Sequence, residues 1–394
     1  LFQSAEAGDP VLEFENIGGT IKIENVVLSS NTSADGGIKI SNARGAVEIR
    51  DTRLEYTGGD GINIDNTAGT GNVTLTNVSA TYGYADGIEI NTRGAVLLNG
   101  VNSSRNYNGA GGYGAYITTQ KGLTVKNSVF DNNDFSGLYL DEASLGAVTL
   151  DNVYAQNNML SGMELSTRGG AVKLNNVKAY QNSQFGVYID SCLAGTGDIC
   201  SNTITSPVTV TNSSMPNNWA GNLVVSANGA VTLVDINASS STINAGIYVE
   251  NHIARSASAV TITRAQATGN DGINIQVLSR GAVTLDTIQA SSSDNNIGLW
   301  VDNSYGTGAV NLFSKSGMND LSGNEIYSLM IISKGAVTIG WVDAGSSGYG
   351  ASISTNGAVT ITGKSTDERS NFGSNEGNGL EISTAGNITL TNVS

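Results

Sequence analysis

The stretch GAVTLDNVYAQN at residues 146–157, followed by GMEL at residues 162–165, decides the fold. Val148 and Leu150 are apolar and flank a threonine, an alternation that puts both side chains on one face of a strand. A second apolar pair begins five residues after the first, and a third follows the glycine of GMEL. The Gly, Asn and Asp residues between these pairs tolerate the left-handed backbone of tight corners. The stretch therefore predicts three short strands joined by sharp turns.

This unit repeats along the whole chain. The first apolar residue of each copy gives fifteen anchors: Ile21, Val47, Val73, Val96, Leu123, Val148, Val172, Val208, Val231, Val260, Val283, Val310, Val337, Val359 and Ile388. Successive anchors are 22 to 29 residues apart, except for one interval of 36. The third segment of the unit recurs as GINI at residues 61–64, GIEI at 87–90, GVYI at 186–189 and GINI at 272–275.

Units of about 25 residues with three short strands cannot each enclose a core, but stacked units share a continuous one. The sequence thus predicts an all-β chain, a parallel β-helix of about 15 coils. Helical solenoids are excluded because no segment has apolar residues at helical spacing, and propeller blades need about 40–45 residues each. We expect an irregular cap or linker over residues 1–18 and a single β-helix over 19–394, with an insertion near 190–207.

Composition narrows the classes of function. The chain has 394 residues, 50 of them Gly and only 3 Pro, and charged residues make up 13%. The net charge of −15 argues against nucleic acid or an anionic membrane surface as partner. No stretch approaches 18 uninterrupted apolar residues, so no inserted segment is expected.

The two cysteines, Cys192 and Cys200, lie in the predicted insertion. Two cysteines in a chain with one histidine cannot fill a tetrahedral metal shell. Their close spacing favours a small disulfide, with buried free thiols as the alternative, and a disulfide would place the chain outside the cytoplasm.

The recurring pattern GAVTLxNVxAxxN…GIxI resembles the right-handed parallel β-helix repeat proteins of the pectate-lyase-like superfamily. Within that superfamily it is most similar to the repetitive arrays of bacterial surface and adhesin-type proteins. The resemblance extends over about residues 21–394. It implies a right-handed coil and an extracellular or cell-surface bacterial setting, in a superfamily of polysaccharide lyases and hydrolases, phage tailspikes, adhesins and surface fibres.

Enzymes of this superfamily carry their chemistry on the outer face of one sheet. The outward column of the third segment holds no two neighbouring carboxylates, so the acid and base of a glycosidase are not expected there. The column instead carries an interrupted aromatic stripe that we predict to contact a ligand or partner: Tyr116, Tyr139, Tyr188, Tyr248 and Trp300. The alternative is that these residues only decorate a half-exposed strand.

One acidic group is a candidate metal site. Asp35, Asp60 and Asp86 fall near the same corner of three consecutive coils. Stacked carboxylates repel unless a cation lies between them, which makes a calcium site conceivable. The alternative is that Asp-Gly is ordinary corner chemistry. Apart from calcium, no cofactor is expected.

The expected function is that of an extracellular structural or adhesive protein, a rod-like segment of a bacterial surface fibre that assembles end to end or laterally. Its partners would be further copies, other surface proteins or glycans. The outward position of the first strand is threonine in ten coils. Stacking of β-branched side chains explains this pattern, and a surface for lateral association is the alternative. The alternative function is a polysaccharide lyase or glycoside hydrolase, or a glycan-binding stalk of the same fold.

Overall fold

The computed structural model describes residues 10–29, 36–107, 111–141, 145–192, 200, 204–293 and 296–394. The chain divides into two compact units, Leu1–Leu193 and Ala194–Ser394, and the division falls inside the predicted insertion. All assigned elements are strands, and the described residues contain no helix with the length and apolar character needed to cross a membrane. The prediction of an all-β parallel β-helix is confirmed.

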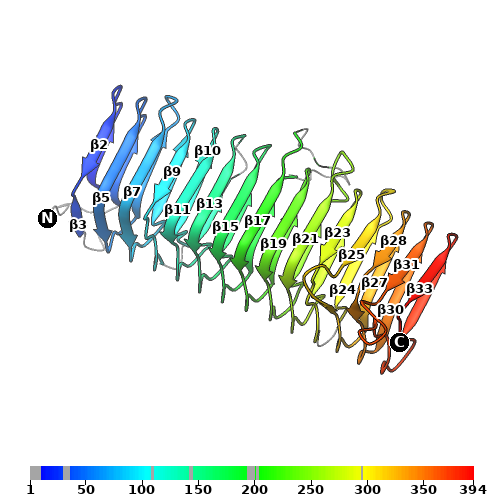
Figure 1. Ribbon diagram of the computed structural model, residues 1–394. Coiled ribbons are helices and arrows are strands. Elements are labelled where there is room, and N and C mark those ends of the chain that lie inside the picture. The colour runs from blue at the N-terminus through cyan, green and yellow to red at the C-terminus, as the bar shows by residue number, and fades with distance from the viewer. Residues whose placement is uncertain are drawn as a thin grey trace. The chain divides into compact units, whose positions relative to one another are not determined.

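Each unit contains two parallel sheets whose strands alternate along the chain (Figure 1). In the first unit, one sheet has the order β1 (Pro10–Glu15), β4 (Gly36–Ser41), β6 (Asp60–Asn66), β8 (Ile88–Thr92), β10 (Ala115–Thr119), β12 (Leu138–Leu140), β14 (Met163–Ser166) and β16 (Phe185–Asp190). The other has the order β2 (Ile21–Glu24), β5 (Val47–Glu55), β7 (Val73–Thr81), β9 (Val96–Asn99), β11 (Leu123–Val129), β13 (Val148–Tyr154) and β15 (Val172–Lys178), and β3 (Val27–Ser29) also pairs with β5.

The second unit repeats this arrangement. Its first sheet has the order β18 (Gly221–Ser226), β20 (Ile247–Glu250), β22 (Ile275–Leu278), β24 (Leu299–Asn303), β27 (Tyr327–Ser333), β30 (Tyr349–Thr355) and β32 (Leu380–Thr384). Its second sheet has the order β17 (Val208–Ser214), β19 (Val231–Asn237), β21 (Val260–Gln266), β23 (Val283–Asp286), β25 (Val310–Phe313), β28 (Val337–Ile339), β31 (Val359–Thr362) and β33 (Ile388–Thr391). Two short strands of this unit, β26 (Asn319–Asp320) and β29 (Val342–Asp343), form a separate two-stranded sheet.

Two of the three predicted strands of a coil often form one bent strand. β13 contains the first apolar pair of the deciding stretch and the first residue of the second pair, and Val148, Leu150 and Val153 are fully buried. The bend lies at Asn152, whose φ is +56°. Asparagine adopts this left-handed conformation at lower cost than other non-glycine residues, so the chain turns there without breaking the ladder.

A buried asparagine column supports the next corner in the first unit. It consists of Asn106, Asn133, Asn158 and Asn182, each ten residues after its anchor. The side-chain oxygen of Asn158 accepts hydrogen bonds from both the backbone N–H and the Nδ2 of Asn133. The Nδ2 of Asn158 in turn donates to Asn182 and to the carbonyl of Phe130. Backbone groups that the corner would bury unpaired are thereby satisfied.

In the second unit, one strand lies at a different position from the one that the sequence predicts. Residues 272–275 were expected to be a third segment with Asn274 pointing outward. Instead β22 begins at Ile275, its outward residue is Gln276, and Asn274 is buried. Asn274 accepts from Asn270 and donates to Asn324, so it belongs to the asparagine column of that unit. Isoleucine on both sides of Asn274 satisfies the alternation in either register, which is why the pattern alone misplaced it.

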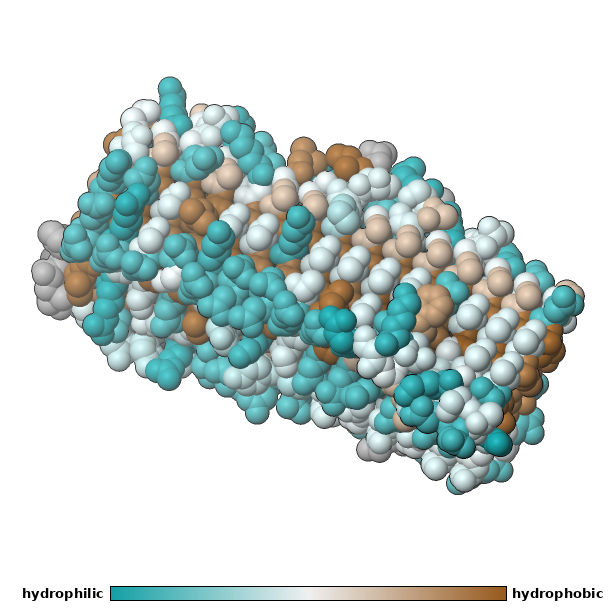
Figure 2. Space-filling view, in the orientation of Figure 1, coloured by the Kyte–Doolittle hydropathy of each residue, from teal (hydrophilic) through white to brown (hydrophobic). Residues whose placement is uncertain are grey.

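Threonine covers the outer face of the longer sheet of the second unit, the one that runs from β17 to β33. In Figure 2 the side chains above these strands form regular, pale rows. Strand pairing places the following residues in one column: Thr209, Thr232, Thr261, Thr284, Asn311, Thr338, Thr360 and Thr389. Cross-strand stacking of β-branched side chains explains this column without a ligand.

Candidate functional site

The candidate site lies on the outer face of the first unit's β6–β16 sheet. Strand pairing aligns the outward residues in the order Asn63, Glu89, Tyr116, Tyr139, Glu164 and Tyr188. The corner just before these strands contributes a second set of side chains, including Asp60 and Asp86. Two columns therefore meet on one surface.

Four aromatic rings gather on this surface. Tyr116 and Tyr139 stack with centroids 5.2 Å apart and planes within 10°. Tyr113 lies at the corner and contacts Tyr116, Tyr139 and Phe135 at 5.4, 5.2 and 5.0 Å. All four residues are half-buried. We call Tyr113, Tyr116, Phe135 and Tyr139 the four-ring surface.

The other predicted aromatic residues lie apart from this surface. Tyr188 is separated from Tyr139 by the strand that carries Glu164, and its ring contacts Phe185. Tyr248 and Trp300 belong to the second unit, where Gln276 lies between them. The predicted stripe is thus one pair, Tyr116 and Tyr139, and three separate residues. Tyr113 and Phe135 were missed because they precede the alternating segment and carry no period-two signal.

Three carboxylates adjoin the four-ring surface. One oxygen from each of Asp60, Asp86 and Glu89 lies within 4.8 Å of the others. The N–H of Asp86 donates to Asp60 at 3.1 Å, and Nδ2 of Asn63 donates to both Asp60 and Glu89. We call Asp60, Asp86 and Glu89 the carboxylate trio. The residues come from two adjacent coils, Asp60 from one and Asp86 and Glu89 from the next. The trio forms because two corner residues approach Glu89 of the outward column, which by itself holds no two neighbouring carboxylates.

Burial and the charges of neighbouring carboxylates raise the pKa values of Asp86 and Glu89. Burial, together with the charges of Asp60 and Glu89, raises the pKa of Asp86 to about 7, although the N–H of Tyr113 donates to it at 2.8 Å. Burial and Asp60 raise the pKa of Glu89 to about 6. Burial, with Glu164 nearby, raises the pKa of Tyr113 to about 12. The tyrosine hydroxyl therefore stays protonated at neutral pH, while Asp86 is divided between both forms.

Replacing Asp86 with Asn is expected to stabilise the chain at alkaline pH. Asp86 binds its proton more tightly in the folded chain than in the unfolded chain, so its contribution to stability is present below about pH 4 and is lost as the pH rises to about 7. At pH 8, Asp86→Asn should be about 4 kcal/mol more stable than the parent, since each of the roughly three pKa units is worth about 1.4 kcal/mol, and at pH 4 the two should be nearly equal. Urea denaturation at both pH values measures this.

The control for that experiment is Asp271→Asn, which changes an exposed corner Asp-Gly of the second unit. It should leave the pH dependence as it is in the parent. An Asp86→Asn chain that loses stability between pH 4 and pH 8 as steeply as the parent would contradict the prediction.

The trio meets the distance requirement for a cation. Calcium binds oxygen at about 2.3–2.6 Å, so two ligands of one ion lie within about 5 Å of each other. Of the predicted ligands, Asp60 and Asp86 meet this requirement, Asp35 lies outside the described residues, and Glu89 joins as a ligand that the sequence did not single out. Calcium binding stays a prediction.

Calcium at millimolar concentration is expected to stabilise the chain by about 1–3 kcal/mol if the trio binds it with the affinity of extracellular modules. The measurement is a thermal melt at pH 8 of protein from which metal ions have been removed with a chelator. The melting temperature without CaCl₂ is compared with those at CaCl₂ concentrations that rise in tenfold steps. Glu89→Gln should abolish the increase in Tm. An unchanged melt, or an equal increase in Glu89→Gln, would exclude the trio as a calcium site.

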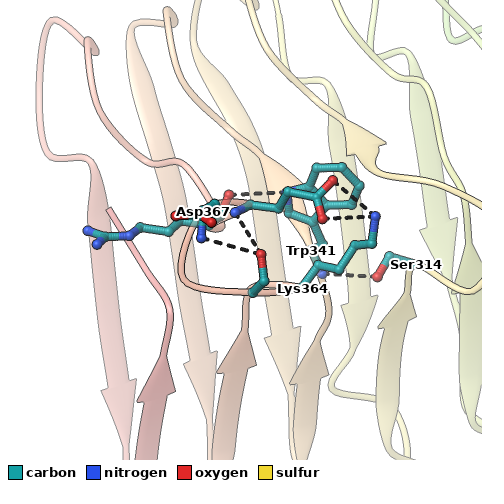
Figure 3. A network of polar contacts seen from close by, with 7 residues as sticks. Ser314, Trp341, Lys364 and Asp367 are labelled. Carbon is teal, nitrogen blue, oxygen red and sulfur yellow. Dashed lines mark hydrogen bonds and ion pairs between the residues drawn. The ribbon is translucent and has the colours of Figure 1, made fainter.

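A polar network in the second unit shows a contrasting case (Figure 3). Trp341 donates from its indole to the carbonyl of Arg369 at 3.2 Å, and its backbone N–H donates to Ser314 at 3.1 Å. Lys364 lies 4.8 Å above the indole ring and pairs with Glu368 at 2.9 Å. Because Lys364 covers one face of the ring and the indole N–H is already bonded, Trp341 is occupied by its own loop.

The predicted disulfide involves two buried residues. Cys192 and Cys200 are fully buried, neither is free, and both are disulfide-bonded. The N–H of Cys192 donates to Asp190, and the carbonyl of Cys200 accepts from Nε of Arg255.

Comparison with known proteins identifies the fold. A family described as the right handed beta helix region matches residues 12–179. No curated protein and no solved structure matches the chain. The resemblance to right-handed parallel β-helix proteins, drawn from the repeat, is thereby confirmed. The adhesin-type subclass stays a prediction.

Proposed function

We propose that this chain is a glycan-binding segment of an extracellular or cell-surface bacterial protein. The observation that carries the proposal is the four-ring surface with carboxylates on its borders. Sugar rings present apolar C–H faces and hydroxyl edges, and they are bound by aromatic side chains next to fixed hydrogen-bond acceptors. The β-helix supplies the rigid scaffold, since each ring is attached to a strand or to the corner beside one.

The charge of the surface selects the class of glycan. Asp60, Asp86, Glu89 and Glu164 form no ion pair with a lysine or arginine in the part of the chain that the structure describes. Uncompensated carboxylates repel uronic acids and sulfated sugars and accept hydrogen bonds from hydroxyl or ammonium groups. Neutral polysaccharides and amino-sugar polymers therefore fit the surface better than acidic ones.

The test is binding to immobilised neutral, amino-sugar and uronic-acid oligosaccharides, followed by calorimetry on those that bind. Tyr116→Ala/Tyr139→Ala should weaken binding by about 2 kcal/mol, roughly 30-fold, because it removes the stacked pair at the centre of the surface. Tyr248→Ala is the matched control, an outward tyrosine in the other unit. Equal binding by parent and double variant, or selective binding of uronic acids, would contradict the proposal.

A second candidate function is hydrolysis of the bound polysaccharide. It is favoured by the trio itself, since a carboxyl group with a pKa near 7 next to one that ionises earlier is the pairing of acid with nucleophile or base. Their separation, at most 4.8 Å, is close to the roughly 5–5.5 Å typical of retaining glycosidases. Release of reducing ends from a bound glycan, lost in Glu89→Gln, would support hydrolysis; binding without release leaves recognition alone.

The surface-fibre role and the bacterial cell-surface location are part of the proposal. A rigid repeat with a ligand-binding face suits an adhesive or structural protein. Assembly by end-to-end or lateral contacts stays a prediction from the sequence.

A further inference from the structure

A groove follows the bend of the longer sheet in the second unit. The bends of β17, β19 and β21 lie at Asn212, Asp235 and Arg264, whose φ values are +50°, +57° and +50°. The two halves of each bent strand enclose an angle, and the stacked angles form a depression of about 460 Å³. Its lining includes Asn237, Gln266 and Gln289 as well as these bend residues.

Side-chain amides repeat along this groove. Strand pairing places Asn237, Gln266 and Gln289 in one column, so that they follow one another at the strand spacing of about 4.8 Å. Within the described residues, the amides of Gln266 and Gln289 have no hydrogen-bond partner. The Oδ1 of Asn237 is buried and has none either. The two exposed amides, those of Gln266 and Gln289, thus keep donors and acceptors available to a ligand, in contrast to the asparagine column of the core, where every amide is engaged.

The groove is electrically balanced. Arg264 donates to both carboxylate oxygens of Asp235, at 2.6 and 2.7 Å, so its guanidinium is already paired. The hydroxyl of Thr287 adds a further neutral polar group to the lining. Such a surface selects a ligand with many hydroxyl groups and no net charge.

We propose that this groove binds a neutral linear polysaccharide, which runs from coil to coil across the stacked strands. Each side-chain amide offers one oxygen acceptor and two N–H donors to sugar hydroxyls, and the column repeats this offer from coil to coil. An extended peptide fits less well, because strand addition needs an open sheet edge and the groove is formed by a sheet face. The inference is independent of the four-ring surface, which belongs to the first unit and has uncompensated charge.

The experiment uses the full chain with the four-ring surface disabled by Tyr116→Ala/Tyr139→Ala. Neutral hexasaccharides of glucose, xylose and mannose are titrated by calorimetry, with a polygalacturonate oligomer as the charged comparison. At least one neutral hexasaccharide should bind and the charged one should not. Adding Gln266→Leu/Gln289→Leu should reduce the affinity about tenfold, because two amides are lost.

The control is Gln276→Leu, an outward glutamine on the other sheet of the same unit, which should leave the affinity unchanged. Gln266 and Gln289 are exposed, so the melting temperature should not change and a loss of affinity is not a loss of folding. The proposal is overturned if no neutral hexasaccharide binds, or if Gln266→Leu/Gln289→Leu binds as tightly as its parent. A failure confined to the Tyr116→Ala/Tyr139→Ala comparison would count against the proposed function and leave this inference intact.

Discussion

Replacing Asn158 with Ala should lower the free energy of unfolding of the first unit by about 3 kcal/mol or more. The backbone N–H and Nδ2 of Asn133 would lose their acceptor, and the carbonyl of Phe130 would lose its donor, all in buried positions. Each buried polar group left unpaired costs about 1–3 kcal/mol. Guanidinium denaturation monitored by circular dichroism measures the loss.

The matched control is Asn175→Ala. Asn175 is exposed and donates to Asp151 at 2.7 Å on the outer face, where water replaces a lost partner. Its effect should remain below about 1 kcal/mol. Similar losses in the two variants would show that the buried column contributes no more than an exterior amide pair.

Phe130→Ala is expected to destabilise the chain by about 3–5 kcal/mol. Phe130 is fully buried, and pairing aligns it with Ser103 on one neighbouring coil and Ala155 on the other. Its ring fills the space that these small side chains leave, so truncation opens a cavity. Phe130→Leu keeps most of the volume and should cost less than about 1.5 kcal/mol. Thermal melts of the two variants give the comparison, and a Phe130→Ala melt equal to that of Phe130→Leu would contradict it.

The fold could be predicted because one period controls all coils. The alternation of Val148 and Leu150 indicates which face of the strand is buried, and the same pair recurs in fourteen further coils. The division of strands was harder to predict, since Asn152 turns the chain without ending the ladder. The buried asparagines had a usable signal, an Asn ten residues after the anchor, but a polar residue carries no hydrophobic periodicity.

The candidate site was predictable only in part. Tyr116 and Tyr139 were found because they occupy outward strand positions, where alternation fixes direction. The approach of Asp86 to Glu89 depends on the backbone conformation of the corner, and a short sequence repeat does not specify that conformation. The raised pKa values arise from the same local burial, which no pattern in the sequence specifies.

The most direct test of glycan recognition is a titration of ring-labelled tyrosine in the full chain with an oligosaccharide that binds, followed by nuclear magnetic resonance. Single Tyr→Phe variants assign the signals. The proposal predicts that the ring signals of Tyr113, Tyr116 and Tyr139 shift together at the ligand concentration that calorimetry reports, while Tyr248 does not move. Ligand binding that leaves those three signals unchanged would contradict it.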